Sequence, residues 1–403
     1  MAETRTGPQS DVHGALGAAC RVCRALGLCP LPLASLAGHA FTLYSFCIML
    51  PLYNLISWMG MRVMYFSPET NMYRYVTNLT CIGSYVLLTN AALLSGQRRM
   101  RHWVHCLNLL VKITPRSKTS EKKERKWIII ICLYVGVVQM MSLSHLLVFG
   151  WTAGNIYMTL MQVTMTLTTY SIAFQNIFMV ARIYSSSSAV NRNLKKSIQF
   201  DGMKTSNVKW TKILRNNFLN VSTVLGPSTD QIDDSWSAVK VREQALAYMS
   251  ICDIIREITA SEAVISILLL VGTITRLMLS AHVLVEPENG ENLSWILIAC
   301  LEFIWGIDTT VKTILVIEPC HSTQHQLRMT KVLINVSRRE RYNDVEVANE
   351  LKLFNYLCCL NEPTFSPFGI CTLDRSLNTR VIIKLPTMNV LYFFTLTTIK
   401  KTY

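Results

Sequence analysis

Long apolar segments place the strongest constraint on what this chain can fold into. A helix that crosses the hydrocarbon core of a bilayer needs about 20 consecutive apolar residues. Six segments approach that length, at 41–59, 76–95, 127–149, 155–181, 263–285 and 294–317. A weaker seventh lies at 381–399, where Lys384, Pro386 and Asn389 interrupt the apolar run. The sequence therefore predicts an all-α polytopic membrane protein, a bundle of seven transmembrane helices with an atypical seventh span.

The composition agrees with a membrane protein. Hydrophobic residues make up 51% of the chain and charged residues only 16%, whereas soluble domains carry about 25% charged residues. The net charge is +14, but no basic run is interleaved with aromatic side chains as a surface for single-stranded nucleic acid requires. We expect the lipid bilayer as a partner and exclude nucleic acid.

The charge of the loops predicts the orientation of the bundle. The loop 97–126 holds ten Lys and Arg residues, while 150–154 and 286–293 hold none. Basic loops stay in the cytosol, so the N-terminus is expected to be intracellular. This orientation is opposite to that of G-protein-coupled receptors and disfavours that class.

On this topology the chain divides into four parts. They are the cytosolic N-terminal segment 1–40, the six transmembrane helices in 41–317 with a long cytosolic loop at about 182–262, the cytosolic anchor helices and turn in 318–377, and the atypical C-terminal segment 378–403.

Two apolar stripes fall in or at the edge of the parts expected in the cytosol. They recur at helical spacing within 248–258 and 347–358, and Asn343 with Glu346 would cap the start of the second helix. Because they cannot face lipid, these stripes need protein partners. The partner is either the same chain, as an intrachain bundle, or a neighbouring subunit.

Opposite charges lie at matching depth in the fifth and sixth spans. Arg276 is nine residues from the outer end at Val285, and Glu302 is eight from Ser294. At about 1.5 Å per residue these depths are nearly equal. A charge at the bilayer centre costs roughly 2.5–3.5 kcal/mol, so each must face protein or water. We predict an intramembrane charge pair, either purely structural or functional.

Several side chains in the outer halves of the third to sixth spans suit a pocket that opens to the outside. Such pockets mix aromatic groups with a few hydrogen-bonding ones. The candidate ligand-binding residues are His145, Tyr157, Gln162, His282 and Trp295. Ordinary helix packing is the alternative for each of them.

No arrangement of residues points to catalysis or a metal. An acyltransferase using His145 would need a second positioned group, and no His-rich or Asp-rich constellation lies near it. Cys20, Cys23 and Cys29 lack a second pair at zinc-finger spacing. We expect no enzyme activity, no metal and no cofactor.

The stretch 365–377 precedes the last apolar segment. Pro367 and Gly369 end the preceding helix, and Asp374 is placed to cap the next one. The motif consists of Gly369, Thr372, Leu373, Asp374, Arg375, Ser376 and Leu377. Its order and position resemble the junction before the seventh span of insect gustatory receptors, which are seven-span chemosensory receptor-channels related to insect odorant receptors.

This resemblance implies a taste receptor that acts as a ligand-gated non-selective cation channel for small-molecule tastants, with bitter compounds favoured over sugars. It also implies a multi-pass protein of the plasma membrane of sensory neurons. Its subunits would form homo- or hetero-tetramers with other receptor subunits, and the cytosolic helices would form a central anchor.

The chain departs from the family pattern in one place. The family's seventh span carries Thr-Tyr, five apolar residues and Gln-Phe, and this run is missing after Leu377. In this family the seventh span lines the ion path. One alternative is therefore a non-conducting receptor subunit. The other alternative, which the number of spans leaves open, is a multi-span membrane transporter.

Overall fold

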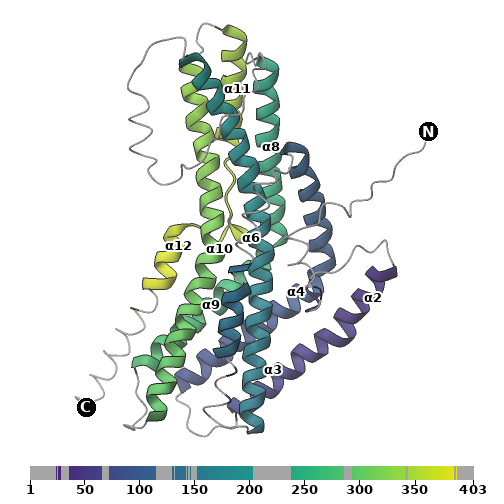
Figure 1. The fold of residues 1–403 in the computed structure, drawn as a ribbon, viewed down its shortest axis with the longest axis vertical. Helices are drawn as coiled ribbons and strands as arrows, with labels where there is room; N and C mark the ends of the chain where they lie inside the picture. Colours follow the sequence, from purple (N-terminus) through teal and green to yellow (C-terminus); the bar gives the residue numbers. More distant parts are fainter. Residues whose placement is uncertain are drawn as a thin grey trace. The chain divides into compact units, whose positions relative to one another are not determined.

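The computed structural model describes residues 24, 26–28, 36–65, 72–114, 129–130, 132–141, 143, 146, 152–202, 237–285, 293–340, 344–384 and 387. All regular elements among these residues are helical (Figure 1). The elements are α2 (Leu36–Tyr44), the π-helix η2 (Ser45–Met49), α3 (Leu50–Tyr65), α4 (Met72–Ile113), α6 (Ala153–Gly202), α8 (Ala238–Ser261), α9 (Ala263–Val285), α10 (Leu293–Glu340), α11 (Val345–Leu360), the 3₁₀ turn η3 (Pro367–Gly369), α12 (Arg375–Thr379) and the π-helix η4 (Arg380–Lys384).

Three helices in the described part are long and apolar enough to cross a bilayer. They are Ala40–Arg62, Tyr75–Ile113 and Ala263–Leu284, and a shorter apolar helix covers Cys132–Met141. The three long helices overlap the first, second and fifth predicted spans, and the shorter helix overlaps the third. The predicted fourth and sixth spans are helical as parts of α6 and α10, where threonines and charges lower the hydropathy. Most of the predicted seventh span, 381–399, lies outside the described residues.

The helices extend well beyond the predicted spans. α4 continues to Ile113 through half of the expected loop 97–126, and α6 continues to Gly202 into the expected loop 182–262. The sequence from 97 to 113 holds no Gly or Pro, and Pro115 comes two residues later. Once nucleated, a helix gains one hydrogen bond per added residue and runs until a breaker stops it. Hydropathy marks the part of the helix in lipid and misses its polar continuation.

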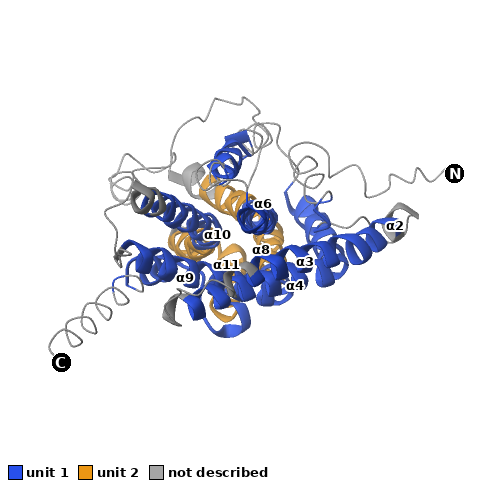
Figure 2. Cartoon of the chain, turned by 90° about the horizontal axis from the view of Figure 1, so that it is seen from below, with its two compact units in different colours: residues 1–183, 255–322, 364–403 blue, residues 184–254, 323–363 orange. Residues whose placement is uncertain are grey.

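Two compact units make up the chain (Figure 2). The first comprises residues 1–183, 255–322 and 364–403, and the second comprises 184–254 and 323–363. A buried apolar cluster lies at the centre of the first unit. Apart from Leu28, its members come from η2, α3, α4, α6, α9 and α10. They are Met49, Tyr53, Cys81, Tyr85, Leu88, Ala92, Leu93, Ile172, Ala173, Ile265, Leu269 and Val316.

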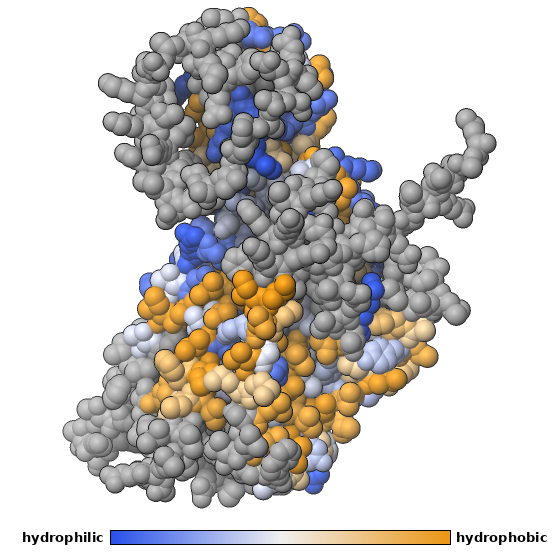
Figure 3. All heavy atoms as spheres, in the orientation of Figure 1, coloured by the Kyte–Doolittle hydropathy of each residue, from blue (hydrophilic) through white to orange (hydrophobic). Residues whose placement is uncertain are grey.

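Large apolar side chains also cover the outside of the first unit. Leu52, Leu55 and Trp58 of α3 and Leu87 and Leu94 of α4 are all exposed. Figure 3 shows apolar side chains gathered over a wide area of the visible face. Soluble monomers rarely expose apolar patches beyond a few hundred Å², so this surface suits contact with lipid chains.

The second unit has its own buried core between α8 and α11. The rings of Tyr248 and Phe354 meet edge to face, with centroids 5.7 Å apart, and Val347, Leu351 and Cys358 are buried on the same face of α11. Burial raises the pKa of the Cys358 thiol to about 12. The apolar stripe of α11 is therefore covered within one chain, which is the first of the two alternatives considered for it.

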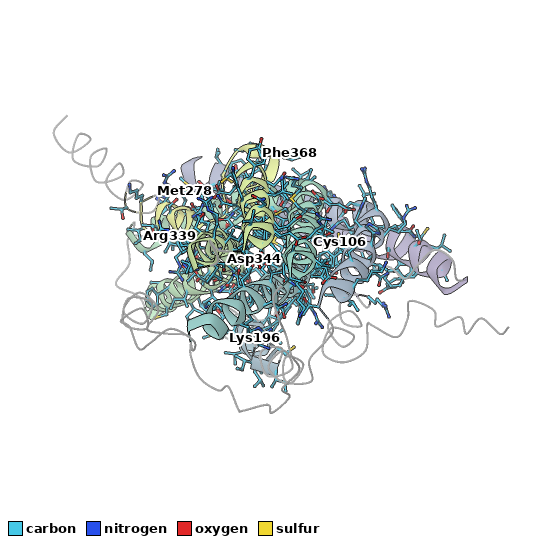
Figure 4. All side chains as sticks on the ribbon, turned by 90° about the horizontal axis from the view of Figure 1, so that it is seen from above. Cys106, Lys196, Met278, Arg339, Asp344 and Phe368 are labelled. Atoms are coloured by element: carbon cyan, nitrogen blue, oxygen red, sulfur yellow. The ribbon has the colours of Figure 1, made fainter. Side chains whose placement is uncertain are left out.

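The cap of α11 differs from the expected one. Asp344 is the capping residue, and its carboxylate accepts from the backbone N–H of Val347 at 3.2 Å (Asp344 is labelled in Figure 4). Its backbone is extended, with φ −98° and ψ 95°, as an N-cap requires. The prediction of a cap by Asn343 with Glu346 is wrong by one position. Asn343 lies outside the described residues, and Glu346 falls in the first turn.

Candidate ligand-binding site

Arg276 of α9 and Glu302 of α10 form an ion pair inside the first unit. Arg276 Nη2 lies 2.9 Å from Oε2 and 3.1 Å from Oε1 of Glu302. Ser280 Oγ, one turn further along α9, donates to the same carboxylate at 3.0 Å. The guanidinium also lies over the ring of Trp305, 5.5 Å from its centroid. The structure thus brings together Arg276 and Glu302, the two residues for which the sequence predicts a charge pair from their equal depth in the fifth and sixth spans.

A second ion pair lies on α10 itself. Lys312 Nζ is 2.5 Å from Asp308 Oδ2, with 5% and 1% of the two side chains exposed. The hydroxyl of Tyr170 donates to Asp308 Oδ1, and that of Tyr134 reaches the same oxygen at 3.4 Å. Lys312 also lies over the Tyr170 ring, 4.8 Å from its centroid. Buried charges need such partners, because an unpaired one is strongly destabilising.

A cavity opens beside these two pairs. It contains about 560 Å³ of empty space, part of which is open to solvent. All of its wall belongs to the first unit. The lining residues are Asn78, Cys81, Ile82 and Tyr85 of α4, Met158, Met161, Gln162, Met165, Thr166 and Thr169 of α6, Arg276 of α9, and Trp305, Thr309 and Lys312 of α10.

Close packing of α4 against α9 positions one part of this wall. A methyl group at Gly272 of α9 would lie 3.0 Å from Ser84 Oγ and 3.3 Å from the Tyr85 ring. A residue larger than glycine would therefore have to displace these side chains. The close approach holds Tyr85 at the cavity, where its side chain is otherwise buried.

The five predicted ligand-binding residues have different positions. Gln162 lies on the cavity wall. Tyr157 is half-buried on α6 and His282 is buried on α9, and neither lines the cavity. His145 lies outside the described residues, as does the side chain of Trp295. A ligand role for Gln162 and for the other four remains a prediction.

Most of the wall was not predicted from the sequence. Met158, Met161 and Met165 follow each other at spacings of three and four on α6, so they share one helix face. In sequence they resemble residues that face lipid. Lys312 follows Asp308 by four positions, the spacing of an ion pair on one helix. That spacing is the signal that could have identified the second pair.

The motif 365–377 forms a compact turn. The N–H of Leu373 donates to the carbonyl of Phe365 at 2.8 Å, and both side chains are buried. Phe368 and Gly369 adopt positive φ values of 50° and 71°; Figure 4 labels Phe368. Left-handed backbone favours glycine, which explains the glycine at 369.

The second half of the motif caps α12 and ties it to α10. Asp374 accepts from the N–H of Leu377 at 3.0 Å and from the Ser376 hydroxyl at 2.7 Å. Partial burial acts to raise the pKa of Asp374, but these hydrogen bonds outweigh it and lower the pKa. Arg375 Nε donates to Glu318 of α10 at 3.0 Å. The hydrogen bonds from Arg375 hold the pKa of Glu318 below its ordinary value.

The described residues show no grouping of three or more His, Cys, Asp or Glu side chains that could hold a metal ion. The described wall of the cavity offers hydrogen-bonding and apolar groups. It can bind a small molecule and hold it between helices.

Residues 16–385 match the family model described as 7tm Chemosensory receptor. Among solved structures the chain is similar to the insect olfactory receptor OR5 from Machilis hrabei, with a TM-score of 0.64 and 10% sequence identity over 94% of this chain and 97% of that chain. This likeness shows an all-α membrane bundle of the insect olfactory receptor type. No curated protein sequence matches the chain. The chain is a multi-pass membrane receptor, not an enzyme, and belongs to the 7tm chemosensory receptor family.

Proposed function

We propose that the protein is a gustatory receptor, a ligand-gated non-selective cation channel that opens when a small-molecule tastant enters the cavity beside Arg276 and Lys312. The observation that carries the proposal is the cavity itself, whose wall draws on four helices, α4, α6, α9 and α10. A ligand held by four helices has different contacts whenever those helices move. Ligand binding can therefore shift a closed–open equilibrium, which requires differential affinity for the two states.

We place this receptor in the plasma membrane of sensory neurons, with its N-terminus inside the cell. The charge of loop 97–126 supports that orientation. The tastant class that we favour is bitter plant compounds, because such molecules are mostly apolar with a few polar groups, as the cavity wall is.

We further propose a homo- or hetero-tetramer whose subunits meet through their cytosolic helices. On α11, Leu353, Tyr356 and Leu360 are exposed, on faces other than the one that packs in the core of the second unit. Apolar side chains left exposed on a cytosolic helix are candidates for contact with another subunit.

A non-conducting receptor subunit is the second candidate function. The observation that favours it is the sequence after Leu377, which lacks the seventh-span signature and carries Lys384, Pro386 and Asn389. Such a chain would bind the tastant and leave the ion path to other subunits.

Voltage clamp of oocytes that express the full chain tests the channel. A panel of bitter plant compounds should evoke inward currents whether the bath cation is Na⁺ or K⁺. Met165→Trp, which fills the cavity, should remove these currents while surface expression persists. Exposed Val332→Trp in the second unit is the matched control. Currents only when other family subunits are present would support the non-conducting alternative, and no current in either setting would contradict the proposed function.

Epitope tags before Met1 and after Tyr403 test the topology. The tag at Met1 should stain only after the cells are permeabilised, and staining of intact cells would overturn the orientation. Staining of the second tag on intact cells would mean that the segment 381–399 crosses the membrane.

A further inference from the structure

We propose that the cavity selects a small neutral ligand that carries a hydrogen-bond acceptor of the carbonyl type on an apolar body, with Lys312 as the donor to that acceptor. This inference rests on the proposed function, in which the cavity takes the tastant. It goes further because it names the chemical class of ligand and the residue that reads it.

The part of the cavity wall that comes from α9 and α10 presents three side chains that donate hydrogen bonds and accept none. Arg276 and Lys312 line it, whereas the carboxylates that pair with them, Glu302 and Asp308, are not among the described residues of the wall. Guanidinium and ammonium groups donate hydrogen bonds and accept none. The indole of Trp305 is also a donor only. A ligand that meets this side of the cavity is complementary to it when it presents an acceptor.

The charges of the two pairs favour a neutral ligand over an anion. Arg276 and Glu302 cancel each other, and so do Lys312 and Asp308. An anionic ligand would add an unbalanced negative charge close to the buried carboxylate of Asp308 and the partly buried one of Glu302. Charges buried without compensation are unfavourable at low dielectric. A neutral acceptor gains a charge-assisted hydrogen bond and leaves the balance unchanged.

Lys312 is better placed than Arg276 to donate to a ligand. Arg276 binds both oxygens of Glu302 and stacks over Trp305. Lys312 has three N–H groups and pairs with one carboxylate oxygen, Asp308 Oδ2. A carbonyl oxygen at the cavity can take one of the other N–H groups without breaking that pair.

The methionines of α6 set the apolar requirement. Met158, Met161 and Met165 present one face of α6 to the cavity. Methionine is flexible and polarizable, so it adapts to ligands of different outline. The recognised class is therefore defined by one acceptor rather than by a fixed shape, and it covers lactones, ketones, esters and amides.

Equilibrium dialysis of the purified full chain in lipid nanodiscs tests the proposal with three two-ring probes of similar size. Coumarin has a lactone carbonyl, naphthalene has no acceptor, and 2-naphthoate is an anion at pH 7.4. Binding is counted as the excess over empty nanodiscs, which removes partitioning into lipid. We expect coumarin to bind at least about tenfold more tightly than either other probe, the effect of one good hydrogen bond.

A paired substitution tests the role of Lys312. In Lys312→Met/Asp308→Asn both charges disappear together, so the site stays neutral and no buried carboxylate is left alone. Coumarin should lose about tenfold in affinity and fall to the level of naphthalene, whose binding should stay unchanged. The matched control is Lys352→Met, an exposed lysine of α11, which should keep the preference.

Met165→Trp serves as a second variant that leaves both ion pairs in place, and it should weaken binding of coumarin to the chain. It keeps the test decisive if the paired variant fails to fold. The proposal is overturned if coumarin does not bind, or if naphthalene or 2-naphthoate binds as tightly as coumarin. It is also overturned if the folded paired variant keeps the preference for coumarin, or if Met165→Trp leaves the affinity for coumarin unchanged.

The outcome is separate from that of the channel experiment. If tastants evoke currents but dialysis shows no preference for coumarin, the proposed function stands and the proposed ligand class is contradicted. If coumarin binds with the expected preference but no tastant evokes a current, the ligand class stands and the proposed channel function is contradicted.

Discussion

Arg99 and Glu262 are 163 positions apart in the chain, yet Arg99 Nε donates to Glu262 Oε1 across 2.8 Å, with 4% of each side chain exposed. Trp103 Nε1 donates to the same oxygen at 2.9 Å, and Arg99 Nη2 donates to Gln175 Oε1 at 3.2 Å. Glu262 lies between the end of α8 and the start of α9. This buried pair therefore joins α4 to the base of the fifth span.

The first prediction concerns this pair. Arg99→Met should destabilise the protein by about 3–5 kcal/mol, because it leaves the Glu262 carboxylate buried without its counter-charge. Thermal unfolding of the detergent-solubilised full chain, followed by fluorescence-detected size exclusion, measures the loss. Arg101→Met, at an exposed position two residues further on, is the matched control. Equal melting temperatures for the two variants would contradict the role given to Arg99.

The second prediction concerns the pair inside the membrane. Arg276→Glu or Glu302→Arg places two like charges side by side, and each should lose most of its surface expression because a lone charge in a span costs roughly 2.5–3.5 kcal/mol. The double reversal restores an ion pair and should recover expression. Flow cytometry of surface-labelled cells measures it, with exposed Arg339→Glu of α10 as the control. If the double variant stays as low as the single ones, the pair does not stabilise the bundle.

The sequence predicts the helical class of this fold better than the length of its helices. Apolar runs at 41–59, 76–95 and 263–285 are visible because lipid demands continuous hydrophobicity. Their polar continuations follow no such demand. No breaker interrupts α4 before Pro115, so its extension to Ile113 is compatible with the local sequence. The contact between Arg99 and Glu262 that fixes this extension in the bundle is one that no local pattern reveals.

The sequence likewise predicts one part of the candidate site and misses another. The pairing of Arg276 with Glu302 could be inferred because two antiparallel spans fix depth along the helix axis. Rotation about that axis is not fixed by depth. His282 and Gln162 lie in the outer halves of their spans, yet only Gln162 faces the cavity. The rotation of a helix about its axis is set by its packing against neighbouring helices, and this packing cannot be read from a single sequence.

The third prediction concerns pH and the pair of Arg375 with Glu318. Because Arg375 lowers the pKa of Glu318, the ionised carboxylate stabilises the folded state. That contribution is present above the ordinary glutamate pKa of about 4.3 and is lost as pH falls through the lowered pKa. Arg375→Gln should therefore lower stability by up to about 1 kcal/mol at pH 7, as for an exposed pair, and the difference from wild type should vanish on acidification.

Thermal unfolding of both proteins between pH 7 and pH 3 measures this convergence. Arg380→Gln changes an exposed arginine, the C-cap residue of α12, and serves as the control for general loss of positive charge. A difference between Arg375→Gln and wild type that persists unchanged at pH 3 would show that Arg375 stabilises the turn by some contact other than that with ionised Glu318.

The fourth prediction tests whether the core of the second unit holds α11 in place without a neighbouring subunit. Phe354 is fully buried against Tyr248, so Phe354→Ala should cost about 3–5 kcal/mol through lost contacts and a cavity. Lys352→Ala, at an exposed position of the same helix, should change stability by less than about 0.5 kcal/mol. Hydrogen exchange of the full chain in nanodiscs, read in peptides of α8 and α11, reports the local opening. Equal exchange in the two variants would mean that α11 is held mainly by contacts with other subunits.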